Sequence, residues 1–145
     1  MAKKKINRGG VIPYRIDEGE IKMLFMVPAE KKFGGEEPQL AKGKQEEGED
    51  DETTAFREAN EELGLFKPNC ENIQKLGVFM GRTTVFIAEV KDMNMFGEPH
   101  FETKETVWLT PSEFNEQGRD LHKPVVKAAA RLIEDSDSNL ERLKK

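Results

Sequence analysis

The sequence is poor in several residue types that would otherwise suggest a function. Its 145 residues include a single cysteine, Cys70, so an intrachain disulfide is impossible. The two histidines, His100 and His122, stand apart without metal-ligand spacing. No apolar run approaches the roughly 18 residues that a membrane-spanning helix needs. The lysine-rich start, residues 1–5, is not followed by an apolar segment, so we expect no secretory signal and a cytoplasmic protein.

The overall composition of the chain fits one packed domain. Apolar residues make up 36% of the chain and charged residues 35%. A chain of this length buries enough surface to fold without a disulfide. We therefore predict a single domain over residues 1–145, with residues 1–8 and 136–145 as flexible ends.

The acid excess of the chain is confined to one window, residues 43–65. Nine acids and two bases there give a charge of −7, whereas the other 19 acids and 21 bases give +2. Such a window is usually a solvated face or a loop. An acidic chain of this kind is not expected to bind duplex nucleic acid.

Periodicity and turn residues predict an α+β protein. We expect strands at residues 10–16, 21–27, 73–80, 84–90 and 105–109, and helices at 51–63, 112–115 and 124–134. Residues 28–42 and 91–104 are predicted loops. The polar stretch after Asp135 is a predicted frayed tail, with an extension of the closing helix by packing of Leu140 and Leu143 as the alternative. A mixed sheet between helices would bury both the apolar strands and the alanine-rich helices.

The acidic window includes three glutamates on one face of the predicted helix. Glu58, Glu61 and Glu62 are three and four residues apart, and like charges at this spacing destabilise a helix. A cation between them would remove that repulsion, and carboxylate oxygens suit Mg²⁺ or Mn²⁺. The alternative is an ordinary solvated helix.

The spacing of the whole window resembles the Nudix box, G-x5-E-x7-R-E-U-x-E-E-x-G-U, in which U is a bulky aliphatic residue. The matching positions are Gly43, Glu49, Arg57, Glu58, Glu61, Glu62, Gly64 and Leu65. Only the first U position departs from the pattern, because Ala59 is smaller than usual.

The resemblance implies a Nudix-type α/β/α sandwich with a mixed central sheet. It also implies hydrolysis of a nucleoside diphosphate linked to another group, with Mg²⁺ or Mn²⁺ as cofactor. Glu58, Glu61 and Glu62 would be the catalytic metal ligands, and the carbonyl of Gly43 would add another. Glu49 and Arg57 would pair to fix the loop against the helix.

Candidates also lie outside the box. Glu102 resembles the position of an extra metal-binding or basic glutamate in some Nudix enzymes, with Glu98 and Glu105 as weaker candidates. Lys42 and Arg82 are predicted to meet substrate phosphates, and Lys44 is a further candidate. Phe33 is the predicted base-stacking residue, since the strand aromatics Tyr14 and Phe79 fit a core better.

These patterns predict a Nudix pyrophosphohydrolase that uses a metal-activated water. The alternative is a catalytically silent Nudix-fold module that binds a nucleotide or a protein. Silent members usually lose a box carboxylate, and this chain retains all of them. ADP-ribose, dinucleoside polyphosphates and related nucleotides remain open as substrates, and a homodimer is possible.

Overall fold

The described part of the chain forms a six-stranded mixed sheet with helices on both faces. The structure is a computed structural model that describes the backbone of residues 7–30, 35–100 and 102–144, and side chains up to residue 136. The strands are β1 (Arg8–Asp17), β2 (Glu20–Pro28), β3 (Ala41–Lys44), β4 (Cys70–Phe79), β5 (Thr83–Val90) and β6 (Thr103–Leu109). The helices are α1 (Asp51–Leu63), α2 (Pro111–Gln117) and α3 (Lys123–Lys144), with 3₁₀ turns at Lys67–Asn69 and Asp120–His122.

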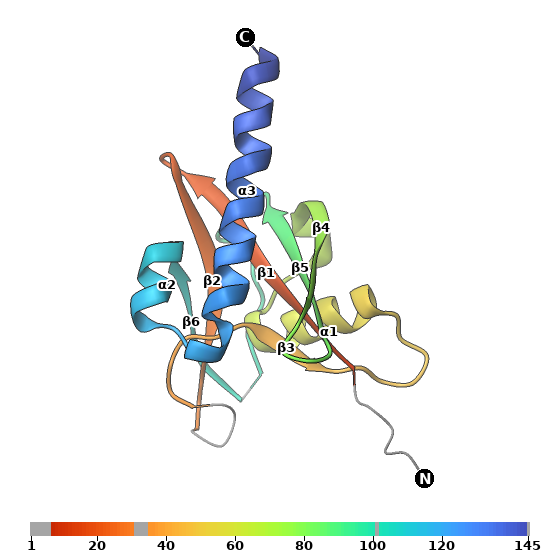
Figure 1. Cartoon of the computed structure of the whole chain (residues 1–145). Helices are drawn as coiled ribbons and strands as arrows, with labels where there is room; N and C mark the ends of the chain where they lie inside the picture. The colour runs from red at the N-terminus through yellow and green to blue at the C-terminus, as the bar shows by residue number, and fades with distance from the viewer. Residues whose placement is uncertain (1–6, 31–34, 101, 145) are drawn as a thin grey trace.

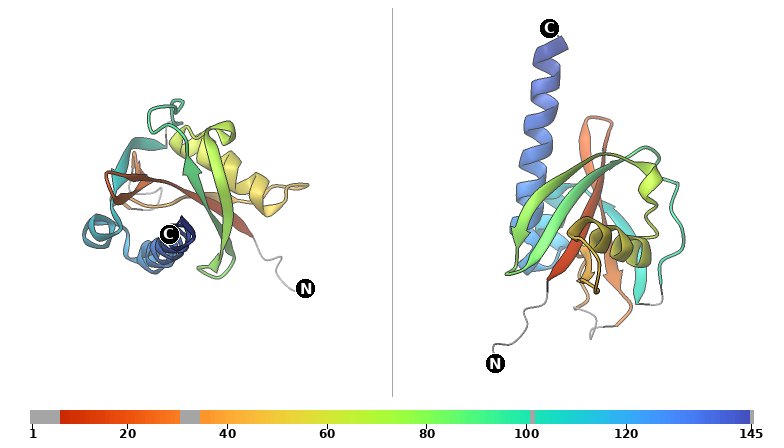
Figure 2. Two further views of the ribbon diagram at one scale, coloured as in Figure 1. Left: turned by 90° about the horizontal axis from the view of Figure 1, so that it is seen from above. Right: turned by 90° about the vertical axis from the view of Figure 1, so that its right-hand side faces the viewer.

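The strand order places β1 at the centre of the sheet. The order is β4-β5-β1-β2-β6. Strand β3 pairs with the first half of β1, from Arg8 to Val11, and β2 pairs with the second half, from Tyr14 to Asp17. The β1–β5 pair is parallel and the other pairs are antiparallel. Helix α1 covers one face of the sheet, and α2 and α3 cover the other (Figures 1 and 2). This arrangement confirms the predicted α/β/α sandwich.

Two apolar cores lie on the two faces of the sheet. Successive apolar residues of the central strands point to opposite faces, so each strand contributes to both cores. In β2, Met23 and Phe25 belong to the core under α2 and α3, whereas Leu24 and Met26 belong to the core under α1. The sequence predicts that this strand is buried on both faces, and Met23 to Met26 are all at most 3% exposed. Neither face of the sheet is therefore left to solvent at its centre.

Helix α1 begins and ends where the sequence predicts. The side chain of Asp50 caps its first turn by accepting from the Thr53 backbone N–H (2.7 Å). Gly64 ends the helix in a left-handed conformation, with φ 72°, which favours glycine. The small residues Ala55 and Ala59 are fully buried, so the helix lies close to the sheet.

The structure differs from the predicted elements in two places. Ala41–Lys44 forms strand β3 beside β1, although its polar, glycine-containing sequence predicts a loop. Helix α3 continues to Lys144 instead of ending at Glu134, because no glycine or proline interrupts residues 135–144. It extends beyond the sheet (Figure 1). At the other end, Arg8 already belongs to β1, and residues 1–6 lie outside the described residues.

Among the described residues, no helix is long and apolar enough to cross a membrane.

Candidate active site

Glycines let helix α1 lie against the β1–β3 pair. A Cβ atom at Gly9 would come within 2.9 Å of the Ala55 backbone nitrogen. A Cβ atom at Gly43 would overlap the carboxyl group of Glu58. Any larger residue at position 43 would therefore displace this carboxyl group, which makes glycine necessary at the first box position.

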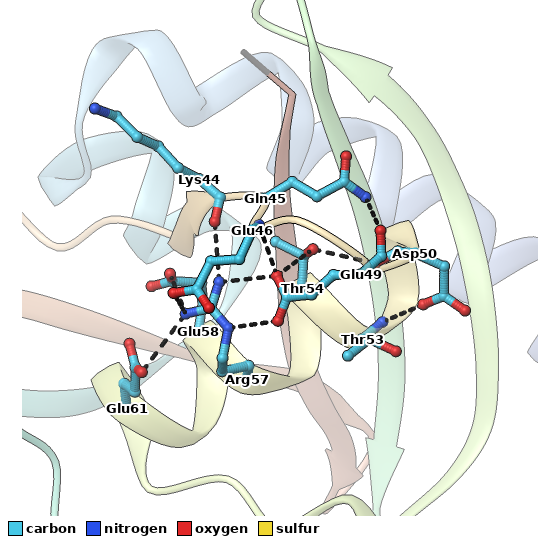
Figure 3. Close-up of polar contacts among 10 residues, drawn as sticks. All are labelled: Lys44, Gln45, Glu46, Glu49, Asp50, Thr53, Thr54, Arg57, Glu58 and Glu61. Atoms are coloured by element: carbon cyan, nitrogen blue, oxygen red, sulfur yellow. Dashed lines mark hydrogen bonds and ion pairs between the residues drawn. The ribbon is translucent and has the colours of Figure 1, made fainter.

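Arg57 holds the box loop and two box carboxylates together (Figure 3). Its guanidinium donates to both carboxylate oxygens of Glu49 (2.7 and 3.1 Å), to Glu58 (2.8 Å) and to the Lys44 carbonyl (2.9 Å). Glu61 lies 3.5 Å from the same guanidinium. The hydrogen bond from Arg57 lowers the pKa of Glu49 to about 2. The arrangement is the Glu49–Arg57 pair that the resemblance implies.

Glu62 is the most deeply placed of the three helix glutamates. Its Oε2 accepts the backbone N–H of Lys42 in β3 (2.9 Å). Burial, together with the charges of Glu58 and Glu102, raises the pKa of Glu62 to about 8 in spite of this bond. Burial also raises the pKa of Glu58. Both carboxyl groups thus lie where negative charge is costly and where a cation would be stabilising.

The register of β3 decides which backbone carbonyls face these carboxylates. Gln45 N–H donates to the Asn7 carbonyl (2.9 Å), and Gly43 lies two residues back, opposite Gly9. Hydrogen-bonded and non-hydrogen-bonded pairs alternate along antiparallel strands. Since Asn7 and Gln45 form a hydrogen-bonded pair, Gly9 and Gly43 form the next one, and Gly43 directs its N–H and carbonyl toward β1. The backbone N–H and carbonyl of Lys42 point away from β1, in agreement with the hydrogen bond from this N–H to Glu62. In this register the carbonyls of Lys42 and Lys44, rather than that of Gly43, point away from β1, and the Lys44 carbonyl accepts from Arg57. The expected role of Gly43 as a metal ligand stays a prediction.

The loop before β6 brings Glu102 to the same place. The Thr103 hydroxyl donates to the Glu62 carbonyl (2.9 Å), and His100 N–H donates to the Glu61 carbonyl (2.7 Å). Glu102 lines a hollow of about 270 Å³ together with Glu62. Its charge contributes to the raised pKa values of both Glu58 and Glu62. We call Glu58, Glu61, Glu62 and Glu102 the acidic wall.

Four basic residues line the same hollow as Glu62 and Glu102. We call these residues, Arg8, Lys42, Lys44 and Arg119, the basic wall. Lys42 matches a predicted site residue and Lys44 a weaker candidate, whereas Arg8 and Arg119 have no signal in the sequence. Arg8 comes from the start of β1 and Arg119 from the connection between α2 and α3.

Comparisons with known proteins agree with this geometry. The model of the NUDIX domain family matches residues 7–133, which is most of the chain. The chain belongs to the Nudix family. No curated protein matches it significantly. The match and the complete Nudix box class the chain as a Nudix pyrophosphohydrolase.

Solved structures share the Nudix fold at low sequence identity. A complex of the *Caenorhabditis elegans* Ap4A hydrolase has a TM-score of 0.74 at 15% identity, covering 90% of this chain and 99% of that chain. A Nudix hydrolase of *Listeria monocytogenes*, described as putative, has a TM-score of 0.72 at 16% identity, with 90% and 96% covered. The Nudix domain of *Shewanella oneidensis* NrtR, solved with ADP-ribose, has a TM-score of 0.69 at 13% identity, with 91% and 90% covered.

The donor set at the Nudix helix fits a divalent metal ion. Carboxylate and carbonyl oxygens are the hard ligands that Mg²⁺ and Mn²⁺ prefer, and Gly43 keeps space for the Glu58 carboxyl group. Within the described residues, no three carboxylates yet converge on one point. The guanidinium of Arg57 contacts both Glu58 and Glu61 on the same side of the helix.

Other predicted site residues lie elsewhere. Arg82 lines a separate hollow with Asp51 and Thr84, and its guanidinium donates to Asn7 (3.2 Å). Phe33 lies outside the described residues. Tyr14 is buried in the core under α3, as expected of a strand aromatic. Glu105 is exposed in β6.

Proposed function

We propose that this Nudix pyrophosphohydrolase is a metal-dependent enzyme that hydrolyses the pyrophosphate linkage of a nucleoside diphosphate derivative. ADP-ribose, dinucleoside polyphosphates and related nucleotides are the candidate substrates. The observation that carries the proposal is the hollow that Glu62 and Glu102 line together with four basic residues. Such a site has acids for metal ions on one side and bases for phosphate oxygens on the other.

The residues proposed to hold the metal are Glu58, Glu61 and Glu62, with the outward carbonyl of Lys42. A bound divalent ion supplies charge neutralisation at the phosphates and lowers the pKa of a water molecule. Lys42 N–H keeps Glu62 Oε2 in place at the edge of β3, so Oε1 is the atom that Glu62 has left to offer. Arg57 orients Glu58 and keeps the Nudix loop against α1.

The attacking water must lose a proton to a nearby base. Glu102 is our first candidate, because its exposed carboxylate makes no hydrogen bond to any described residue and lines the hollow beside Glu62. Glu61 and Glu62 are the alternatives. A Glu102→Gln variant that loses rate mainly at neutral pH, and regains it as hydroxide rises, would support Glu102.

The test is hydrolysis of a nucleotide panel with Mg²⁺, with Mn²⁺ and with a chelator. We expect product from ADP-ribose, from dinucleoside polyphosphates or from a related nucleotide only when a metal ion is present. Glu47→Gln is the matched control, because Glu47 is an exposed acid of the same window. Substrate binding without turnover by the parent chain would instead favour the silent Nudix-fold module. Self-association stays a prediction.

A further inference from the structure

The cations of the basic wall share one face of the β1–β3 pair. Arg8 lies opposite Lys44, and Gly10 lies opposite Lys42. Opposed residues in antiparallel strands point to the same face, and so do residues two apart. A Cβ atom at Gly10 would lie only 3.0 Å from the Cβ of Lys42, in agreement with this. Arg8, Lys42 and Lys44 therefore point away from the face that α1 covers, and Figure 3 shows Lys44 directed away from Glu58.

Arg119 joins this face from the connection between α2 and α3. Its backbone N–H donates to the Pro38 carbonyl (3.0 Å), and its guanidinium donates to Gln39 Oε1 (3.4 Å). Nearby, the Leu40 N–H donates to His122 Nδ1 (3.1 Å). These contacts attach residues 38–40 to the α2–α3 connection and place Arg119 beside β3.

The cations of the basic wall are close to one another and poorly paired. Burial lowers the pKa of Lys42, and the positive charges of Arg8 and Arg119 lower it further, whereas the charges of Glu62 and Glu58 offset only part of this. Arg57, outside the basic wall, is well paired, since its guanidinium donates to two carboxylates and a carbonyl. The four cations of the basic wall differ, because among the described residues their only side-chain hydrogen bond is the one from Arg119 to Gln39. Nearby cations with unused donors are the arrangement that binds a multiply charged anion.

We infer that the basic wall is a subsite for phosphate groups beyond the two that flank the bond being cleaved. The inference rests on the proposed function, because the acidic wall would hold those two phosphates through metal ions. A substrate with only two phosphates would leave the basic wall without a phosphate partner. The preferred substrate class is therefore a nucleotide with a chain of three or more phosphates, rather than a diphosphate such as ADP-ribose.

The kinetic test compares substrates that differ only in phosphate number. The parent, Arg119→Gln and Arg8→Gln are assayed on dinucleoside di-, tri- and tetraphosphates, and Arg131→Gln serves as the control because Arg131 is exposed on α3. For the parent, we expect kcat/KM to rise about tenfold or more from diphosphate to tetraphosphate. Arg119→Gln and Arg8→Gln should lose most of that rise, through KM, so that their loss on the tetraphosphate exceeds their loss on the diphosphate by about tenfold. Equal losses on all three substrates, or none, would overturn the inference.

A binding test separates this inference from the proposed function. Calorimetric titration of the parent with inorganic pyrophosphate and tripolyphosphate needs no turnover. We expect tripolyphosphate to bind about tenfold more tightly, and Arg119→Gln to remove the difference while Arg131→Gln retains it. If this pattern holds but no nucleotide is cleaved, the subsite stands and the hydrolytic proposal fails. Equal binding of the two anions by the parent would overturn the subsite, whatever the hydrolysis assay shows.

Discussion

The acidic wall and the basic wall meet at one hollow, which Glu62 and Glu102 line together with the four cations, but the two walls are built in different ways. Three of the four acids come from one helix, within five residues, and Arg57 links two of them. The four cations come from β1, β3 and the α2–α3 connection, and make one side-chain hydrogen bond among the described residues. Most contacts of the first wall lie within the Nudix box, whereas the second wall depends on elements that are far apart in the sequence. We therefore expect changes in the acidic wall to alter the chemical step, and changes in the basic wall to alter substrate binding.

The largest effect is expected from Glu62→Gln. The substitution keeps the size of the side chain but removes the charge that we propose holds a metal ion. Loss of several kcal/mol of transition-state stabilisation corresponds to a fall in kcat of about 10³-fold. Steady-state kinetics at saturating substrate and metal measure it. Glu47→Gln should stay within about twofold of the parent, and a comparable loss there would mean that total acidity, rather than position, matters.

A smaller effect is expected from Gly43→Ala. The new Cβ would overlap the Glu58 carboxyl group and push it from its place beside β3. We expect the Mg²⁺ concentration for half-maximal activity to rise about 10- to 100-fold, as for other groups that orient metal ligands. The measurement is a metal titration of activity, with circular dichroism to verify the fold. An unchanged Mg²⁺ requirement in a folded variant would remove Glu58 from the proposed ligands.

Arg57→Lys tests the link that stabilises the acidic wall. Lysine cannot reproduce the fork that contacts Glu49, Glu58 and the Lys44 carbonyl together. We expect the free energy of unfolding to fall by about 1–2 kcal/mol, a modest amount because the guanidinium is partly exposed. Urea denaturation measures it. A variant as stable as the parent would show that the Nudix loop does not need this link.

The buried His122 accepts the Leu40 N–H beside the basic wall, and we expect it to make the free energy of unfolding depend on pH. Burial and, to a smaller extent, the charges of Lys42 and Arg119 lower its pKa to about 3, so the folded state keeps His122 neutral near pH 7. The unfolded state takes up a proton as pH falls through the ordinary histidine pKa near 6.5, so the stability due to neutral His122 is present above that pH and is lost below it. Between pH 7 and 5 this loss is about 2 kcal/mol at most.

The check is to compare the parent with His122→Asn, whose side-chain oxygen can accept the Leu40 N–H. The variant should be less stable at pH 7 because of lost packing, but its stability should fall less between pH 7 and 5. Urea denaturation at the two pH values gives both slopes. Parallel slopes would show that His122 does not titrate between the folded and unfolded states.

Much of the fold and of the acidic wall follows from local sequence. Helix α1 was predictable because Asp50 and Gly64 mark its ends. The spacing of the Nudix box then places three glutamates on one face of that helix. Strand β3 was not predictable, because the four residues Ala41–Lys44 lack a strand pattern and form the strand only by pairing with β1. Without β3, neither the direction of the Lys42 carbonyl nor the shared face of Arg8 and Lys44 could be inferred.

Arg119 shows the other limit of sequence reasoning. It lies about 80 residues from Gln39, which it contacts, and nothing near it in the sequence marks a site. Glu102, by contrast, was selected by its resemblance to a position in related enzymes, and the structure places it beside Glu62. Residues brought together by long-range packing are visible only when the fold is known.

The most direct test of the two walls is a parallel measurement of kcat and KM for Glu62→Gln and Arg119→Gln on a dinucleoside tetraphosphate with Mg²⁺. We predict that Glu62→Gln lowers kcat by about 10³-fold. We also predict that Arg119→Gln raises KM about tenfold and leaves kcat within about twofold. A fall in kcat of the same size in both variants, with KM unchanged, would contradict the division of the site into a metal-binding wall and a phosphate-binding wall.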